Sequence, residues 1–582
     1  MNITNTIVRL AAPYPAVAFD VFDTLIKRDV AKPTDVFLLQ GTDFARARVC
    51  AEQAARAQNT GEITLPQIYA QPSMEKFDPA EECAWENKVV VPYTPVQEAV
   101  RLLRAQGKRV YYISDMYLPP EQIAAMLDRC GYPPFDGGFV SSAYGVQKRS
   151  GALFRRFLRE TGFKCGDVLF VGDSWRADVT GAALAGIRSW HLPTEPPPET
   201  AFPDSAVQAF TANHEAFVSG WGDRLGFTLL GALEVAFCQW IHARREEHPE
   251  AGLFFLARDM YLTREIYHRM YPQEETKYLE VSRRSLCPCL LAQNEKELVA
   301  AALPRQRLTG QQIADYCGAS CPEAYRQKTY MLKTKEGQEA LPALLDALQP
   351  PREATLALAY LRQSGLRAGD ILVDIGSGGT TQFLLQKLLG VSLYGLQLSG
   401  DARLRERFSE EETSVFLSLQ GADACLYWVG QPMLERMISQ DVGATVGYRQ
   451  LGQTVCVCQQ PQNREKRIDE LQRGALRFAE EWQNSALSGI RISAVAAIMP
   501  FLRMVRCPRK SQVAFLGRIQ VEDGGTYTLA DPKKLRHYIF HPVEMKRDLA
   551  ESRWKIGFLQ KLLPGPLPYG RLYLGMKKQK ER

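Results

Sequence analysis

Three short apolar segments in the N-terminal third of the chain each end on polar residues, and this pattern constrains the fold more than any other. These segments are Ala16–Phe22, Lys108–Ser114 and Asp167–Asp173. The amphipathic stretches between them include residues 96–106, 121–130 and 152–161. Short apolar strands that alternate with amphipathic helices predict a parallel β-sheet with helices on both faces. Polar residues at the ends of such strands meet at the carboxyl edge of the sheet, which is where ligands bind in α/β folds.

A proline-rich segment follows this region. Five prolines lie between residues 191 and 206, and they cannot continue a helix or a central strand. At 582 residues the chain is also too long for a single hydrophobic core. We therefore predict an α/β domain at residues 1–195, a second, Rossmann-like α/β domain at 205–455 and a basic C-terminal region at 456–582. Strands of the second domain are expected at residues 252–257, 277–282 and 370–376.

Charge is distributed unevenly along the chain. From Pro461 to Arg582 there are 24 Lys and Arg against 12 Asp and Glu, so this part carries +12 and the remainder −6. A basic region predicts either an anionic partner or a plain solvated surface. The stretch from Ser552 onward mixes Trp, Phe and Leu with Lys and Arg. This composition is typical of peripheral contact with an anionic membrane, and equally of a helix docked on its own domain. Nucleic-acid binding is not expected, because no motif accompanies the charge.

The most apolar long stretch, Leu225–His242, contains Glu234 and Gln239, so we predict a buried helix of a soluble domain instead of a membrane span. The first residues lack the basic start of a secretory signal. Thirteen cysteines without such a signal predict reduced thiols and a cytoplasmic protein. The closely spaced cysteines lack the paired CxxC spacing of a structural zinc site, and buried thiols are expected. They are Cys287 and Cys289, Cys317 and Cys321, and Cys456 and Cys458.

The strand ends of the first domain carry several carboxylates. Asp20, Asp173 and Asp178 would converge at one edge of the sheet, and like charges that close need a compensating cation. Carboxylate oxygens suit Mg²⁺, which keeps room for waters and a substrate phosphate. Lys148 and the hydroxyl of Ser114 would then bind phosphate oxygens opposite the metal. A carboxylate left facing the phosphorus would be a nucleophile, and an aspartyl-phosphate intermediate would follow.

Four motifs in this order resemble those of the haloacid dehalogenase (HAD) superfamily. They are AFDVFDTL, YYISD, GVQKRSG and FVGDSWRADVTGAALAG, and the resemblance covers roughly residues 14 to 192. It implies a Rossmann-like domain with a helical cap, inserted at about residues 28–95, that closes over the site. It also implies metal ligands, which would be Asp20, the main-chain carbonyl of Phe22, Asp173 and Asp178. The catalytic residues that it implies are Asp20 as nucleophile, Lys148, Ser114 and Thr24.

One position departs from the pattern of typical phosphatase members. They carry a second Asp two residues after the nucleophile, which protonates the leaving group, whereas this chain has Phe22. A phenyl ring cannot donate a proton, and the loss of a general acid typically removes about 10²–10⁴-fold of the rate. Dehalogenase members also carry an aromatic residue there. The neighbouring Asp23 would point away by strand alternation unless a tight turn redirects it. The sequence is therefore compatible with three roles for this domain: phosphoryl transfer, hydrolysis of another kind of bond, or no catalysis.

The second domain carries weaker motifs. Arg258 and Asp259 follow one predicted strand, and Arg283 and Arg284 follow another. Arginines at a strand end suit phosphate. An ion pair of Asp259 with Arg283 or Arg284 explains these residues equally well. LVDIGSGGTTQ is a strand with a Gly-rich turn, which either cradles a phosphate or makes a tight connection without a ligand. It is loosely similar to a motif of S-adenosylmethionine-dependent methyltransferases and to a phosphoribosyltransferase loop. The residues of this second candidate site are Arg258, Asp259, Arg283, Arg284, Asp374, Gly376, Gly378 and Thr380.

These patterns predict a Mg²⁺-dependent HAD-type phosphatase that acts on a small phosphorylated metabolite or sugar phosphate. The succession ARDMYL, VSRRS and VDIGSGGTTQ resembles the C-terminal half of large two-part HAD-like bacterial proteins that accompany surface-polysaccharide glycosyltransferases. This resemblance implies a role in polysaccharide biosynthesis, although likeness of fold does not fix function. One alternative is a non-catalytic accessory protein of glycan assembly that binds a phosphorylated ligand. Another is a transferase whose second domain uses a nucleotide or sugar-phosphate donor.

Overall fold

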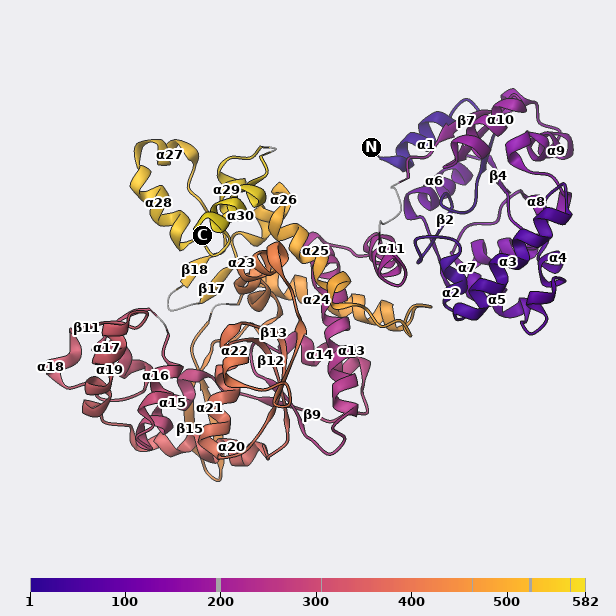
Figure 1. The fold of residues 1–582 in the computed structure, drawn as a ribbon. Helices are drawn as coiled ribbons and strands as arrows, with labels where there is room; N and C mark the ends of the chain where they lie inside the picture. Colours follow the sequence, from indigo (N-terminus) through magenta and orange to yellow (C-terminus); the bar gives the residue numbers. More distant parts are fainter. Residues whose placement is uncertain are drawn as a thin grey trace. The chain divides into compact units, whose positions relative to one another are not determined.

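The computed structural model describes residues 2–194, 200–304, 306–462, 464–522, 526–565 and 567–580. The chain divides into two compact units, which we describe separately (Figure 1). The first unit comprises Met1–Ser219 and Glu481–Arg491. The second comprises Gly220–Glu480 and Ile492–Arg582. The three-part division drawn from the sequence stays a prediction.

The first unit is built on a five-stranded parallel sheet with the order β5-β4-β1-β6-β7. Its strands are β1 (Ala16–Phe19), β4 (Arg109–Ser114), β5 (Gly137–Val140), β6 (Val168–Gly172) and β7 (Arg188–His191). Every residue of β1 and β6 is buried, because helices cover both faces of the sheet. The predicted parallel α/β fold is therefore confirmed. The central strand β1 lies between β4 and β6, so the ends of all three meet at one edge.

The helices that follow these strands lie close to their predicted positions. They are α6 (Thr94–Ala105), α7 (Pro120–Arg129) and α9 (Ala152–Thr161). Helix α9 buries Leu153, Phe154 and Phe157, and the ring of Phe154 packs edge-on against Phe170 of β6 with centroids 4.8 Å apart. The helix ends at Gly162, whose left-handed conformation suits glycine. This packing fixes the start of α9, and with it the loop just before the helix, against the end of β6.

A helical insertion separates β1 from β4. It is bounded by an antiparallel strand pair, β2 (Ile26–Arg28) with β3 (Val90–Pro92). Its helices, grouped together in Figure 1, are α2 (Asp35–Leu38), α3 (Thr42–Gln58), α4 (Leu65–Tyr69) and α5 (Pro79–Lys88). The fully buried guanidinium of Arg48 in α3 makes two hydrogen bonds to the Glu82 carboxylate of α5, at 2.6 and 2.9 Å. Removing one partner of such a buried pair typically costs about 3–5 kcal/mol.

The second unit contains another five-stranded parallel sheet, with the order β14-β13-β12-β8-β9. Its strands are β8 (Leu253–Leu256), β9 (Thr276–Leu279), β12 (Ile371–Ser377), β13 (Tyr394–Gly400) and β14 (Thr413–Leu417). The three strands predicted for this region correspond to β8, β9 and β12. The second α/β domain predicted from the sequence is thus confirmed as a fold.

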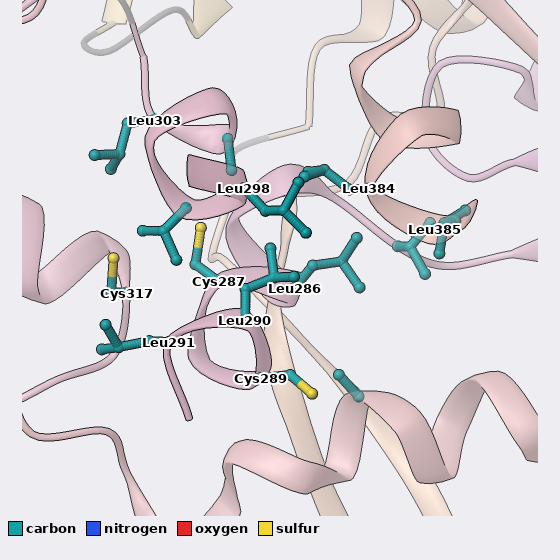
Figure 2. Close-up of a cluster of buried hydrophobic side chains, with 14 of the residues drawn as sticks. Leu286, Cys287, Cys289, Leu290, Leu291, Leu298, Leu303, Cys317, Leu384 and Leu385 are labelled. Carbon is teal, nitrogen blue, oxygen red and sulfur yellow. The ribbon is translucent and has the colours of Figure 1, made fainter. Parts of the chain in front are cut away.

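Leucines and cysteines form much of the hydrophobic core of the second unit (Figure 2). Leu286, Cys287 and Leu290 of α15 (Arg283–Ala292) pack together with Leu384 of α21 (Thr380–Leu389). Cys317 belongs to the same buried cluster. These thiols occupy the place of small apolar side chains. The four cysteines of this core that we expected to be buried are so, whereas Cys456 and Cys458 are half-buried.

One helical stretch among the described residues, Trp221–Glu246, is long and apolar enough to cross a membrane, and 78% of its most apolar window is buried inside the protein. It consists of α12 (Trp221–Gly226), a π-helical turn and α13 (Ala232–Glu246). Within α13 the fully buried Glu234 accepts a 2.7 Å hydrogen bond from the Thr263 hydroxyl. The stretch is therefore an interior helix of the second unit.

The basic C-terminal region is helical. Its helices are α24 (Lys466–Gln483), α25 (Ala494–Arg506), α26 (Lys510–Leu516), α27 (Leu535–Phe540), α28 (Pro542–Glu551), α29 (Lys555–Leu562) and α30 (Tyr569–Lys580). Helix α25 packs against α13 and α23 (Gly421–Ile438) of the second unit. Trp554, Phe558 and Leu562 are buried, so this stretch of the tail is docked on its own unit.

A buried histidine links distant parts of the first unit. In α11 (Asp204–Glu215), the His214 Nε2 lies 3.0 Å from Asp29 Oδ2 and its Nδ1 lies 2.7 Å from Glu481 Oε2. The ring also stacks on Phe210 with centroids 3.9 Å apart. Burial lowers the pKa of His214, but hydrogen bonds to the two carboxylates outweigh it and raise this pKa from 6.5 to about 9. The charged ring therefore ties α11 and residue 481 to the chain just after β2.

We expect His214→Gln to destabilise the first unit in a pH-dependent way. A raised folded-state pKa adds stability that is fully present below the unfolded pKa and is lost as the pH rises through the folded pKa. Below about pH 6.5 the free energy of unfolding of the wild type should therefore be up to about 3 kcal/mol larger than that of the variant. This difference should disappear as the pH rises past about 9. Urea unfolding across this range checks the trend, with the exposed His268→Gln as control. A gap that does not vary with pH would contradict it.

Candidate active site

The end of β1 places Asp20 at the carboxyl edge of the first sheet. The strand stops at Phe19, but the Asp20 N–H still donates to the Val171 carbonyl of β6 at 2.9 Å. Its side chain faces Asp173 and Asp178, and one oxygen from each of the three carboxylates lies within 4.8 Å of the others. Among the described residues this is the group of acidic, histidine and cysteine side chains whose spacing suits a metal ion.

Asp178 reaches this edge through a tight approach to β6. It lies in a π-helical turn, Trp175–Thr180, and its Oδ2 accepts the Ser174 N–H at 2.9 Å. A Cβ atom at Gly172 would lie 2.4 Å from Asp178 Oδ2, so only glycine lets the carboxylate approach the end of the strand. The sequence places Gly172 directly before Asp173, and this explains the glycine of that motif in physical terms.

Lys148 lies between two of these carboxylates. Its Nζ donates to Asp20 Oδ1 at 2.6 Å and to Asp178 Oδ1 at 2.7 Å, and only 2% of the residue is exposed. Its backbone N–H donates to both carboxylate oxygens of Asp115, at 2.8 and 3.1 Å. Asp115 directly follows β4. Our sequence reasoning named Ser114 but overlooked Asp115, although the aspartate at the end of YYISD is the signal for it.

Burial and mutual repulsion disturb the charges of this cluster. Burial raises the pKa of Asp20 well above its usual value, Asp178 and Asp173 raise it further, and Lys148 lowers it. Burial, then the charges of Asp23 and Asp178, raise the pKa of Asp173. Burial alone would lower the pKa of Lys148, but Asp20 and Asp178 raise it above its ordinary value. One ammonium thus faces three carboxylates, and this set of hard oxygen donors fits a divalent cation such as Mg²⁺.

The turn after Asp20 sets three neighbouring side chains. The Arg28 guanidinium stacks over the Phe22 ring, with its Cζ 3.9 Å from the ring centre. Asp23 has a positive φ of 58°, a left-handed conformation that Asp tolerates better than most residues. The charge of Asp23 also contributes to raising the pKa of Asp173. The buried Thr24 donates a long 3.5 Å hydrogen bond to Asp173 Oδ1.

Ser114 and Phe22 complete the set of residues predicted for this site. Ser114 is buried at the last position of β4, next to Asp115. The structure thus brings the predicted acidic residues, Lys148 and Thr24 into direct contact, and it places Ser114 at the same sheet edge. The main-chain carbonyl of Phe22 stays a predicted ligand.

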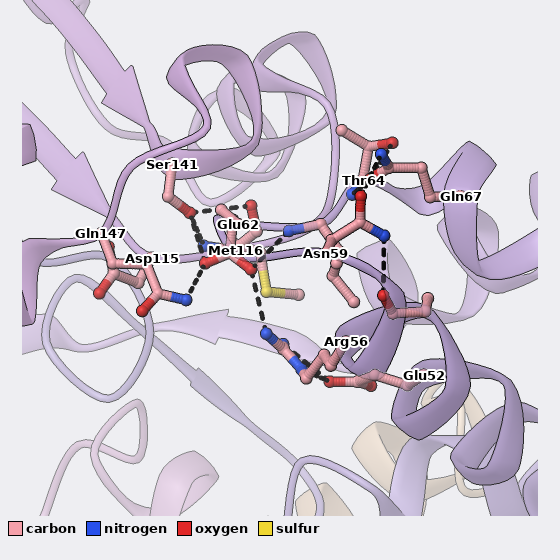
Figure 3. A network of polar contacts seen from close by, with 12 residues as sticks. Glu52, Arg56, Asn59, Glu62, Thr64, Gln67, Asp115, Met116, Ser141 and Gln147 are labelled. Atoms are coloured by element: carbon pink, nitrogen blue, oxygen red, sulfur yellow. Dashed lines mark hydrogen bonds and ion pairs between the residues drawn. The ribbon is translucent and has the colours of Figure 1, made fainter.

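The helical insertion contacts the loop that carries Lys148 (Figure 3). Glu62, between α3 and α4, accepts hydrogen bonds from the Ser141 hydroxyl at 3.1 Å and the Gln147 amide at 3.0 Å. It also pairs with Arg56 at 3.2 Å. Because Gln147 directly precedes Lys148, a movement of the insertion would shift the position of Lys148. No feature of the sequence indicated the role of Glu62.

The residues of the second candidate site lie at the carboxyl edge of the second sheet. Asp259 accepts hydrogen bonds from Arg258 Nε at 3.2 Å and from the Ser439 hydroxyl at 3.1 Å. Its recorded ion pair is thus with Arg258, and neither Arg283 nor Arg284 takes that place among the described residues. Burial, then the charge of Asp259, raise the pKa of Asp374 to about 7, whereas Arg283 lowers it.

Other members of this predicted set have contacts of their own. Arg284 lies 5.8 Å from the centre of the Tyr316 ring. A Cβ atom at Gly376 would lie 1.8 Å from the Ser399 carbonyl, so this glycine serves the packing of β12 on β13. Arg407 Nη1 donates to the Gly378 carbonyl at 2.6 Å and to the Thr380 hydroxyl at 2.8 Å. At this edge Arg258 therefore pairs with Asp259, and the charges of Asp259 and Arg283 act on Asp374.

Known proteins and protein families resemble part of this chain. A family model of haloacid dehalogenase-like hydrolases matches residues 14–186, and a comparison with curated protein sequences found no match. Similar solved structures include a HAD phosphatase from Thermococcus onnurineus, at 16% identity over 32% of this chain and 89% of that chain, with a TM-score of 0.24. Another is YfnB from Bacillus subtilis, described as a HAD-hydrolase bound to magnesium, at 20% identity over 30% and 87%, with a TM-score of 0.24. Residues 14–186 therefore form a haloacid dehalogenase-like hydrolase domain.

Proposed function

We propose that the first unit is a Mg²⁺-dependent phosphatase that acts on a small phosphorylated metabolite or sugar phosphate. The observation that carries this proposal is the bridge from Lys148 to Asp20 and Asp178 beside Asp173. Such a site combines a nucleophilic carboxylate with a fixed positive charge and an acidic set of metal ligands. These are the parts that hydrolysis of a phosphate ester requires.

In the proposed reaction the carboxylate of Asp20 attacks phosphorus and the bond from phosphorus to the leaving oxygen breaks. The phosphoryl group is then an acyl phosphate on Asp20, which water hydrolyses to free phosphate and the regenerated carboxylate. Lys148, held by Asp178 and by the contact of its backbone with Asp115, stabilises the charge on the phosphoryl oxygens. The hydroxyls of Thr24 and Ser114 donate to the same oxygens.

Asp20, Asp173, Asp178 and the main-chain carbonyl of Phe22 would hold Mg²⁺. When bound, the ion would supply positive charge to the phosphoryl oxygens. The support for this assignment is electrostatic. Without a further cation, burial and the neighbouring carboxylates raise the pKa of Asp20 and so disfavour the ionised nucleophile.

Leaving-group protonation falls to Asp23 in this proposal. The Phe22 ring cannot donate a proton, and it is packed under Arg28. Asp23 is exposed, and its charge acts on Asp173 at the site. Its left-handed backbone conformation directs it differently from the alternation of an extended strand. In its protonated form, such a carboxyl group near the leaving oxygen would donate the proton as a general acid, and the water that attacks the acyl phosphate would return one to it.

A second function is favoured by the same Phe22. A domain without the usual proton donor can bind a phosphorylated ligand and not turn it over, which suits an accessory protein of glycan assembly. The resemblance of the second unit to two-part HAD-like bacterial proteins supports surface-polysaccharide biosynthesis as the setting for either function. Ligand-dependent thermal stabilisation without release of phosphate would select the binding function.

We expect Asp20→Asn to abolish phosphate release. A carboxamide cannot form the acyl phosphate, so the rate with Mg²⁺ and a sugar phosphate should fall by about 10³-fold or more. Release of inorganic phosphate measures the effect, and Asp128→Asn, on the exposed side of α7, is the matched control. Removing Mg²⁺ with EDTA should reduce wild-type activity to the same level. Equal activity of the wild type and Asp20→Asn would exclude the proposed nucleophile.

Asp23→Asn should slow substrates in proportion to the basicity of their leaving group. Hydrolysis of an alkyl phosphate should fall by about 10²-fold, because its alkoxide needs a proton. Hydrolysis of p-nitrophenyl phosphate should change little, because nitrophenolate leaves unprotonated. Steady-state kinetics with the two substrates separates the cases. If both rates drop equally, Asp23 does not act as the general acid.

A further inference from the structure

A polar cavity of about 380 Å³ lies in the second unit. Its wall combines Arg258 after β8, the C-terminal half of α23, the connection from β16 (Thr454–Gln459) to α24, and residues around the start of β17 (Gln520–Glu522). Such a volume matches the pockets that hold small molecules. Four separate stretches of chain converge on it, so it is a feature of the tertiary fold.

Arginines supply the positive charge of this cavity. Arg436 is fixed by an ion pair with Asp441 and donates to the Gln520 carbonyl at 3.2 Å. Arg518 lines the same wall and has no recorded ion-pair partner among the residues that the structure describes. One guanidinium is thus held in place and a second is available, which suits the oxygens of a phosphate group.

The remaining wall offers partners for hydroxyl groups. Glu435 is 3.8 Å from Arg258 and accepts a hydrogen bond from Gln431 at 3.1 Å. The amide of Gln440 accepts from the Tyr278 hydroxyl at 3.0 Å, which leaves its N–H₂ group as a donor. Further glutamines at 460, 462 and 520 line the cavity. Carboxylate and amide groups in this number suit a ligand with several hydroxyls and exclude a purely apolar one.

The cavity opens from the carboxyl edge of the second sheet. Burial, then the charge of Asp259, raise the pKa of Glu435 to about 8, and Arg258 lowers it. Asp374 of β12 also raises this pKa, so the strand-end carboxylates and the cavity wall are electrostatically linked. Ligands of parallel α/β sheets bind at this edge.

We propose that this cavity binds a phosphorylated carbohydrate, or another small phosphate ester with several hydroxyls. The phosphate lies against Arg518 and Arg436, and the hydroxyls lie against Glu435 and Gln440. Arg258, 3.8 Å from Glu435, adds a further positive charge to the wall near the hydroxyls. This site would give the chain a second binding function, independent of turnover in the first unit.

Calorimetric titration of the full-length protein with glucose 1-phosphate in EDTA tests this site. Arg518→Ala should weaken binding by about tenfold or more, because a charged hydrogen bond to phosphate is lost. Arg405→Ala, which removes an exposed arginine of α22 (Ala402–Arg407), should leave it unchanged. Glucose without phosphate should not bind measurably.

Hydrogen exchange on the same samples locates the ligand. Protection of residues 432–440 and 516–521 is expected on addition of glucose 1-phosphate. Protection confined to residues around Lys148 would assign the ligand to the first unit and overturn the proposal. Absence of binding, or equal affinity of the wild type and Arg518→Ala, would overturn it as well. None of these results depends on phosphatase activity, so the two proposals fail separately.

A different observation concerns the surface of α27 and α28. Three large apolar side chains are exposed where these helices meet, with Ile539 at 67%, Phe540 at 80% and Val543 at 78%. The acidic Glu544 nearby is already paired with Lys533 and His537. The three apolar side chains are therefore exposed to water, and the charge of Glu544 is neutralised by its ion pairs.

Exposed basic side chains flank this apolar tip. Lys534, Arg536 and Lys546 are exposed there, and the structure records no ion-pair partner for them among its described residues. From Asp531 to Glu551 the chain has 5 Lys and Arg against 4 Asp and Glu, and one of the acidic residues, Glu544, is paired with Lys533 and His537. Apolar side chains rimmed by basic ones suit the interface of an anionic bilayer. We infer that this tip docks on an anionic lipid surface.

Vesicle sedimentation tests the lipid surface. The wild type should bind vesicles that contain phosphatidylserine and not vesicles of phosphatidylcholine alone. The double variant Phe540→Ala/Val543→Ala should partition about tenfold less, because the apolar anchor is lost. Leu451→Ala, at a 68% exposed position of β15 (Thr445–Leu451), is the matched control. Failure of the wild type to bind, equal binding to both vesicles, or an unchanged double variant would each refute docking on anionic lipid.

Discussion

The buried contact of Lys148 with Asp20 and Asp178 is the interaction on which the candidate active site depends. Three carboxylates within 4.8 Å repel one another, and at this depth water does little to screen them. The ammonium of Lys148 offsets part of that repulsion and cannot be removed without leaving buried charges unpaired, which typically costs about 3–5 kcal/mol. The remaining excess of negative charge is what makes a divalent cation a favourable addition. The same carboxylates that fix the buried Lys148 are therefore the ones that the proposed metal ion would bind.

The parallel sheet converts distant sequence segments into this contact. Because β1 lies between β4 and β6, residues that follow the three strands meet at one edge. Gly172 then removes the Cβ atom that would block Asp178, and Asp115 fixes the backbone of Lys148. Glu62 extends the same chain of contacts to the helical insertion. The position of that insertion is therefore linked to Lys148 through Gln147, the residue that precedes it.

The sequence was informative where burial dictates residue type. Runs of apolar residues dominate β1, β4, β6, β8 and the start of β12, so these strands could be predicted, whereas β13, which alternates apolar with polar residues, was not. The edge strands β5 and β7 could not, because Gly137–Val140 begins with two glycines and Arg188–His191 is largely polar. Asp115 could have been predicted from its place at the end of YYISD. The role of Glu435 could not, because it arises from tertiary contacts, and the ion pair of Asp259 with Arg258 depends on the loop conformation.

Different groups offset the negative charge at the two sheet edges, and this difference supports different ligands. At the first edge one lysine faces three carboxylates, whose oxygens lie close enough together to hold a metal ion. At the second edge arginines at 258 and 283 face Asp374 and Glu435, whose pKa values of about 7 and about 8 let a proton supply the missing positive charge. A protonated carboxyl group donates a hydrogen bond where an ionised one can only accept. These charges support the proposals that the second edge recognises hydroxyls and phosphate and that Asp20 attacks phosphorus at the first edge.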